Sequence, residues 1–351
     1  MKELEIFGQR LRNARIMKCL SMDELCSKMN HTISKMAISK YERGELSPNS
    51  NILIKFSEAL GQPVDYFFRP FALHISDIQF RKKSKLSVKQ ANSIKETIAD
   101  NIEKYINIEE ICNSIIDFKK PNWEVSNSNE AKKYALQLRH NWQIGNDGIL
   151  NLVSLLEEHG IKILFIDADE SFDGLSTIVN DAYPVIVLNS YFITERNRFT
   201  AAHELGHIML SFEKGAEQKE IERLCNVFAS EFLIPSEALI DELGSKRTSI
   251  SIIELEHLQR QYGISKDALI YKAKENNVIS QSLFESCMKR KNSQPSFKAI
   301  MEGSVYCMKE TSDRFQSLVY MALNKGMISE SKASALLNVP QETFRKTYLA
   351  I

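Results

Sequence analysis

Apolar residues recur every three or four positions through most of the chain, the spacing that places them on one face of a helix. Only one region, roughly 161–189, contains short continuous apolar runs of the strand type, namely IKILFID, GLSTIVN and PVIVLN. Brief polar connections separate the segments. The pattern predicts a mainly α, multidomain protein with a small β region in its middle.

Shifts in composition mark the boundaries between the predicted domains. Residues 1–70 carry about five helix signals, and the basic, polar run FRKKSKLSVKQ follows them. Helical spacing returns over 87–117 and stops at KKPNWEVSNSNE, which contains a proline and a Ser/Asn cluster. We predict a helical domain over 1–70, a basic and helical connector over 71–124, an α+β domain over 125–275 and a helical C-terminal region over 276–351.

Composition and charge exclude several classes of protein. The 351 residues exceed one typical domain, and 43% hydrophobic with 26% charged residues is ordinary for a folded globular chain. Six cysteines without a CxxC pair argue against a disulfide framework. The start, MKELEIFGQRLRNARIMK, lacks the apolar core of a signal peptide, and no stretch has 18 uninterrupted apolar residues. We therefore expect a cytoplasmic protein that does not enter a membrane.

Two short helices joined by a tight turn are predicted near the N-terminus. Ser21 and Glu24 form a capping-box pattern at the start of SMDELCSKM, and SKMAISKYERG follows, with Gly44 as its stop. In the second helix Ile38 and Tyr41 share one face, while the opposite face is polar and basic. A helix of this kind fits the major groove of DNA, although the same bundle would also suit protein contacts.

The stretch ISKYERGELSPNSNILIKFSEALGQPVDYFF resembles the Cro/cI-type (XRE) helix-turn-helix family in its Ile-Ser, Tyr-Glu-x-Gly, Pro and closing Ala-Leu-Gly elements. The resemblance implies a five-helix, lambda-repressor-like fold that binds a double-stranded DNA operator, and we expect a homodimer there. It implies that Glu42 pairs with a basic residue of the same domain. Met22 stands where the family often has a Gln that contacts phosphate. The positions that match the family's groove and DNA-backbone contacts are Lys35, Met36, Ser39, Lys40, Arg43 and Ser21.

The segment RNRFTAAHELGHIMLSFEK has helical spacing and contains the pattern HExxH. His203 and His207 project from one face, one turn apart, so both imidazoles can bind one Zn²⁺ ion at about 2.0–2.1 Å. Glu204 can then reach a water in the open coordination position, which is the arrangement of a hydrolytic zinc site. A third ligand is needed, and the next helix offers Glu220 and Glu222.

Residues 125–275 resemble the ImmA/IrrE metallopeptidase family, which is often fused to an XRE domain. The resemblance lies in ILNLVSLLEEHGIKILFID, FDGLS, VIVLN, the Arg-x-Arg-Phe-Thr run before HELGH, and the pattern from Asn226-x-Phe-Ala to Pro235. It implies a zincin-like fold of the gluzincin type, one zinc ion per chain, and a repressor-type protein substrate that is cut in trans or within this chain. Cys225 replaces the commoner Ala.

The resemblance also assigns roles to individual positions. It favours Glu222 over Glu220, because Asn226 and the residues after it then match the family pattern. The implied metal ligands are His203, His207 and Glu222, Glu204 is the implied general base, and Asn226 hydrogen-bonds a ligand histidine. The alternative function is a non-catalytic repressor or antitoxin whose zinc domain is a sensor or an interaction module.

Several assignments stay open at this point. The donor that stabilises the oxyanion is unidentified, and Tyr183, Tyr191 and Arg198 are its candidates. The strand PVIVLN is either an edge for an extended peptide or a buried strand. The basic run Arg81, Lys82, Lys83 and Lys85 either follows DNA phosphates or is a solvated linker. The C-terminal helix pair in MISESKASALLNVPQETFRK looks superficially like a second helix-turn-helix, but its apolar face favours packing.

Overall fold

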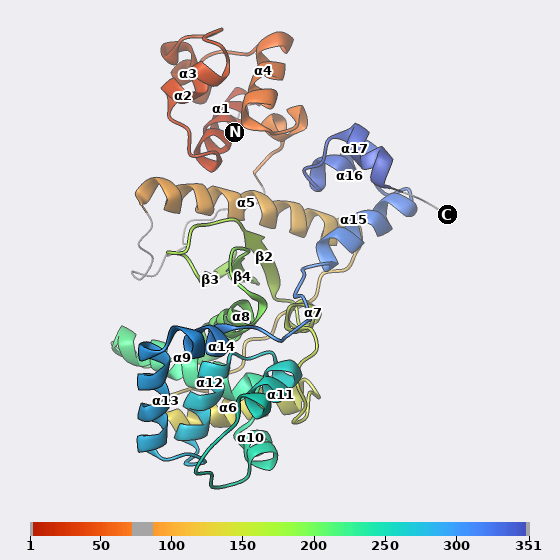
Figure 1. Ribbon diagram of the computed structural model, residues 1–351. Coiled ribbons are helices and arrows are strands. Elements are labelled where there is room, and N and C mark those ends of the chain that lie inside the picture. Colours follow the sequence, from red (N-terminus) through yellow and green to blue (C-terminus); the bar gives the residue numbers. More distant parts are fainter. Residues whose placement is uncertain (1–2, 72–86, 349–351) are drawn as a thin grey trace. The chain divides into compact units, whose positions relative to one another are not determined.

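The structure is a computed structural model that describes residues 3–71 and 87–348 (Figure 1). It divides into two compact units. The first comprises Met1–Ile116, Val179–Ala182 and Asp313–Ile351, and the second comprises Asp117–Ile178 and Tyr183–Ser312. The chain is mainly helical with a small sheet, as predicted. The basic run from Arg81 to Lys85 lies outside the described residues.

The N-terminal bundle of the first unit has the five predicted helices. They are α1 (Glu3–Met17), α2 (Met22–Lys28), α3 (Lys35–Glu42), α4 (Ser50–Leu60) and the 3₁₀ helix η1 (Val64–Phe68). The predicted capping box at the start of α2 is present, with both of its hydrogen bonds. A Cβ at Gly8 would lie only 2.6 Å from the carbonyl oxygen of Tyr41, so α1 and α3 approach each other closely because position 8 has no side chain.

The first unit also contains α5 (Val88–Ile111) and three C-terminal helices, α15 (Arg314–Asn324), α16 (Glu330–Leu336) and α17 (Gln341–Thr347). Leu336 and Phe344 share a buried cluster with Tyr105 and Ile108 of α5. The C-terminal helix pair therefore uses its apolar face for packing. The predicted segment 276–351 is divided between the two units, because its residues from 313 onward join the core around α5.

The second unit contains a three-stranded sheet in the order β2-β4-β3. Its strands are β2 (Lys162–Ile166), β3 (Gly174–Val179) and β4 (Tyr183–Asn189), and β2 pairs in parallel with β4. The run PVIVLN is therefore a central, buried strand, and β3 lies at an edge. A second, two-stranded sheet consists of β1 (Trp123–Glu124) and β5 (Leu210–Ser211), which pair in parallel.

Nine helices of the second unit surround one hydrophobic core among the described residues. They are α6 (Ser128–Asn141), α7 (Leu152–Glu158), α8 (Thr194–Met209), α9 (Gln218–Leu233), α10 (Ser236–Leu243), α11 (Ile252–Tyr262), α12 (Lys266–Glu275), α13 (Gln281–Ser293) and α14 (Pro295–Glu302). Helix α8 packs against both β4 and α9 (Figure 1). No helix within the described ranges is long and apolar enough to cross a bilayer.

Candidate metal centre

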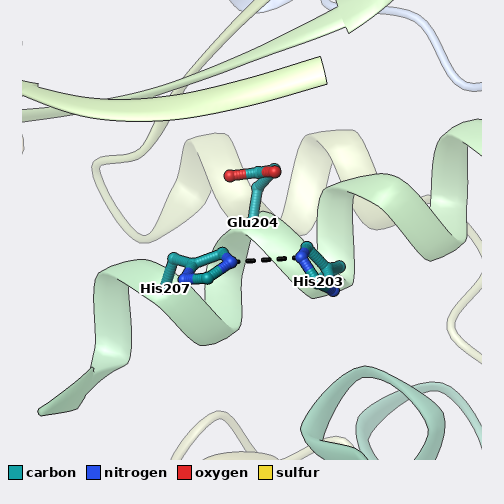
Figure 2. A group of neighbouring side chains, drawn as sticks. All are labelled: His203, Glu204 and His207. Atoms are coloured by element: carbon teal, nitrogen blue, oxygen red, sulfur yellow. Dashed lines mark hydrogen bonds between the residues drawn. The ribbon is translucent and has the colours of Figure 1, made fainter. Parts of the chain in front are cut away.

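Helix α8 carries three neighbouring side chains with metal-binding atoms, His203, Glu204 and His207 (Figure 2). Their possible ligand atoms all lie within 4.8 Å of one another. The helix is anchored by a buried face that includes Leu205 and Ile208. The helical period then turns the two histidines toward the same side, as the sequence spacing predicts.

Gly206 lets the next helix approach this site. A Cβ at Gly206 would lie 3.2 Å from Cδ1 of Phe228 and 3.4 Å from Cα of Cys225, both on α9. A contact of that kind is tight, so glycine permits the closest approach of α8 and α9. The close approach brings Glu222 of α9 to the two histidines.

Two imidazole nitrogens and one carboxylate converge with the spacing of a tetrahedral metal site. The Nε2 atoms of His203 and His207 are 3.1 Å apart. Glu222 Oε2 lies 3.3 Å from His203 Nε2, and Glu222 Oε1 lies 3.7 Å from His207 Nε2. Ligands bound tetrahedrally to zinc at about 2.0–2.2 Å are separated by about 3.3–3.6 Å. The three separations here, from 3.1 to 3.7 Å, lie on either side of that range, so small shifts of the side chains would fit them to one such ion.

The far side of each ring has a hydrogen-bonding partner on α9. The Oδ1 atom of Asn226 lies 2.8 Å from His203 Nδ1, and because an amide oxygen only accepts, Nδ1 carries the proton. The Nε2 lone pair of His203 is then directed at the other ligands. On His207, Nδ1 lies 3.2 Å from the sulfur of Cys225. With both ring protons on Nδ1, the two Nε2 lone pairs and the Glu222 carboxylate would face one another, an arrangement that a cation between them stabilises.

The two candidates for the third ligand differ in their surroundings. Glu220 is partly exposed and accepts hydrogen bonds of 2.6 and 2.8 Å from Arg223, which lower the pKa of its carboxyl. Glu222 is mostly buried, and Gln218 donates a hydrogen bond of 2.8 Å to its Oε1. The structure thus directs Glu222, and not Glu220, toward the histidines.

Glu204 is only 6% exposed and lies beside the histidines. The hydroxyl of Ser176, on the edge strand β3, donates a hydrogen bond of 2.6 Å to Glu204 Oε2. Sequence reasoning missed this contact, although Ser176 belongs to the FDGLS motif, because 28 residues separate the two positions. It also missed Cys225 and Gln218, which the helical spacing from Glu222 placed on the same face.

The three candidates for an oxyanion donor all have other partners. The Tyr183 ring lies under the ammonium of Lys162, at 5.1 Å. The hydroxyl of Tyr191 donates a hydrogen bond of 2.6 Å to Glu170. Arg198 is buried, forms an ion pair with Glu310 and donates to two backbone carbonyls. These contacts give each residue a structural role.

The residues assigned to DNA contact are gathered on and around α3. Lys35, Met36, Ser39 and Lys40 lie on this helix, and Met36 is 71% exposed. Lys35 Nζ pairs with Asp23 at 2.6 Å on the surface.

Their neighbours complete the helix-turn-helix. Ser21 caps α2, and Arg43 Nη1 donates a hydrogen bond of 2.7 Å to Ser39 Oγ. The predicted partner of Glu42 is Arg15, which donates two hydrogen bonds of 2.6 and 2.9 Å to it. Met22 is partly buried and packs against the core of the bundle.

Comparison with known proteins agrees with this architecture. A model of the helix-turn-helix family matches residues 11–67, and a model of the IrrE N-terminal-like domain matches residues 156–274. The radiation response metalloprotease IrrE of Deinococcus deserti is 35% identical over 106 residues, which are 27% of this chain and 37% of the relative. That of Deinococcus radiodurans is 30% identical over 107 residues, which are 27% of this chain and 32% of the relative. The chain thus spans about a third of the length of these relatives. It carries an XRE-type helix-turn-helix domain together with an IrrE N-terminal-like domain.

Proposed function

We propose that this chain is a DNA-binding transcriptional regulator with a built-in zinc-dependent metalloendopeptidase. The observation that carries the proposal is the tetrahedral spacing of His203, His207 and Glu222, with Glu204 beside them. Both relatives named above are metalloproteases, which supports the same chemistry.

Each residue of the site would have a separate role in peptide hydrolysis. His203, His207 and Glu222 would hold one Zn²⁺ ion per chain, and bound zinc supplies a water with a pKa lowered to about 7 and polarises the substrate carbonyl. Glu204 accepts the proton of the attacking water on its carboxylate and returns it to the leaving amine. Ser176 holds that carboxylate through Oε2. Asn226 keeps the proton of His203 on Nδ1.

The edge strand β3 supports a substrate that binds in an extended conformation. An edge strand offers unpaired backbone groups with which an extended peptide can pair. Ser176 lies on β3 and touches Glu204, so a peptide paired with this strand would run past the general base. We expect a flexible segment of a repressor-type protein as the substrate, either in another protein or in this chain.

The helix-turn-helix domain provides the second activity. An exposed α3 suits insertion into the major groove of a double-stranded operator. This helix carries Lys35, Met36, Ser39 and Lys40, and Arg43 and Ser21 lie near it. Two copies on a two-fold symmetric site would give a homodimer on DNA. The helix-turn-helix domain would bring the peptidase domain to DNA-bound repressors. Alternatively, cleavage within this chain would release its own helix-turn-helix domain from the peptidase domain.

The decisive test compares proteomes of cells that express the wild-type protein, Glu204→Gln or the exposed control Glu213→Gln. We expect one protein fragment with wild type and with the control, and at least about a hundredfold less of it with Glu204→Gln, because only Glu204 accepts the proton. Metal analysis should find zinc in all three proteins. Equal cleavage by the Glu204 variant would refute the mechanism. No cleavage by any of them, with zinc and DNA binding retained, would favour the sensor or interaction module.

A further inference from the structure

We infer that Cys225 is a positioning residue for the metal centre. Its sulfur accepts a hydrogen bond from the Nδ1–H group of His207, which turns the Nε2 lone pair of that ring toward the other ligands. The inference rests on the proposed metal site, and it adds a role for a residue that stands where the family commonly has Ala.

The contact between Cys225 and His207 is short and enclosed. Cys225 Sγ lies 3.2 Å from His207 Nδ1, and the Cys225 side chain is fully buried. The direction of this hydrogen bond depends on the tautomer of His207. A ring that binds a cation through Nε2 carries its proton on Nδ1, so in that state the nitrogen donates and the sulfur accepts. The Nε2 atom of His207 faces His203 Nε2 at 3.1 Å and Glu222 Oε1 at 3.7 Å. A proton on Nδ1 is the tautomer that leaves Nε2 able to bind a cation.

Helix α9 presents the supporting groups as one set. Glu222, Cys225 and Asn226 are separated by three and four residues, so they lie on one face of the helix. Glu222 faces both histidines, Asn226 holds His203 and Cys225 holds His207. Each ligand histidine thus receives one partner from consecutive positions of α9.

The packing of α8 on α9 sets the distance of this contact. A Cβ at Gly206 would lie 3.4 Å from both Cα and Cβ of Cys225. At this spacing of α8 and α9, the sulfur reaches the imidazole of the residue adjacent to Gly206, His207.

The experiment measures zinc affinity of the full-length protein by competition with a chromophoric chelator. Removing a hydrogen-bond partner of a metal-binding histidine costs about 10- to 100-fold in metal affinity, so we expect Cys225→Ala to weaken zinc binding at least about tenfold. Cys225→Ser keeps an acceptor and should restore most of the affinity. The Co²⁺-substituted protein should show a changed visible spectrum for Cys225→Ala, because the orientation of one ligand changes. Cys26→Ala, which removes a buried thiol from the N-terminal bundle, is the matched control and should bind zinc as wild type does.

The outcomes separate this inference from the proposed function. If wild type does not bind zinc, the metal site itself fails. If Asn226→Ala weakens binding while Cys225→Ala has wild-type affinity and spectrum, the role of Cys225 is refuted and the site stands. NMR of the ¹⁵N-histidine-labelled wild-type protein without zinc gives an answer even where a variant misfolds. In the zinc-free protein a His207 proton on Nε2 would overturn the inference, and a proton on Nδ1 would support it.

Discussion

Replacing Gly8 by Ala should destabilise the helix-turn-helix bundle, because it forces α1 away from α3. A Cβ at this position would lie 2.6 Å from Tyr41 O, 2.7 Å from Glu42 O and 2.8 Å from Gly44 N. All three are backbone atoms, so no flexible side chain can move aside. The helices must separate by several tenths of an ångström, and the buried contacts of Phe7 and its neighbours loosen with them.

Two opposing terms set the size of the effect. Overpacking costs about 1–3 kcal/mol, and contact with rigid backbone puts this site at the upper end or above it. Replacing a helical glycine by alanine gains about 1 kcal/mol in helix propensity. We therefore expect a net loss of about 2 kcal/mol in the unfolding free energy of the bundle, which is about a thirtyfold change in its unfolding equilibrium.

Hydrogen exchange of the full-length protein measures this loss separately in each unit. Amides of α1 and α3 should lose about thirtyfold of their protection. Trp123 and Trp142 both belong to the second unit, so the unfolding transition that their fluorescence reports should not change. Gln9→Ala, at an exposed position on the same helix, should leave protection almost unchanged. Protection that stays constant or rises for Gly8→Ala would show that helix propensity dominates, and the close packing of α1 on α3 would be wrong.

Two further predictions concern the proposed metal ligand on α9 and the exposed face of α3. Glu222→Gln should weaken zinc binding by more than about ten- to hundredfold, which is the loss typical when a residue that only hydrogen-bonds a metal ligand is replaced. Glu220→Gln should leave the zinc affinity unchanged, because Glu220 pairs with Arg223. Equal zinc affinities of the two variants in a chelator competition would refute the ligand assignment. The triple variant K35A/S39A/K40A should bind a selected operator duplex at least about tenfold more weakly than wild type in gel shifts. Its circular dichroism spectrum should stay that of wild type. An unchanged gel shift would rule out α3 as the helix that enters the major groove.

Short-range patterns in the sequence determined much of the local structure. The capping box of Ser21 and Glu24 predicted the start of α2, and both of its hydrogen bonds are present. The helical period placed His203 and His207 one turn apart on α8. These predictions succeed because caps and helix faces depend on residues within about four positions of one another.

Longer-range assignments depended on resemblance or stayed open until the tertiary structure was known. Glu220 and Glu222 lie on the same helix, and the face of α9 that packs on α8, which carries Cys225, decides that Glu222 faces the histidines. The apolar content of PVIVLN suited either an edge or a central strand, and the pairing of β4 with β2 makes it central. The contact of Ser176 with Glu204 also required the fold of the second unit.

The sequence by itself therefore determined the mainly helical character of the chain, the cap at the start of α2, the two domain types and the pairing of His203 with His207 on α8. Only the tertiary structure decided that Glu222 faces the two histidines and that β4 is the central strand of its sheet. It also decided that residues from 313 onward pack with α5. The physical reason is that backbone hydrogen bonds and caps are local, whereas these features depend on how apolar faces far apart in the chain fit together.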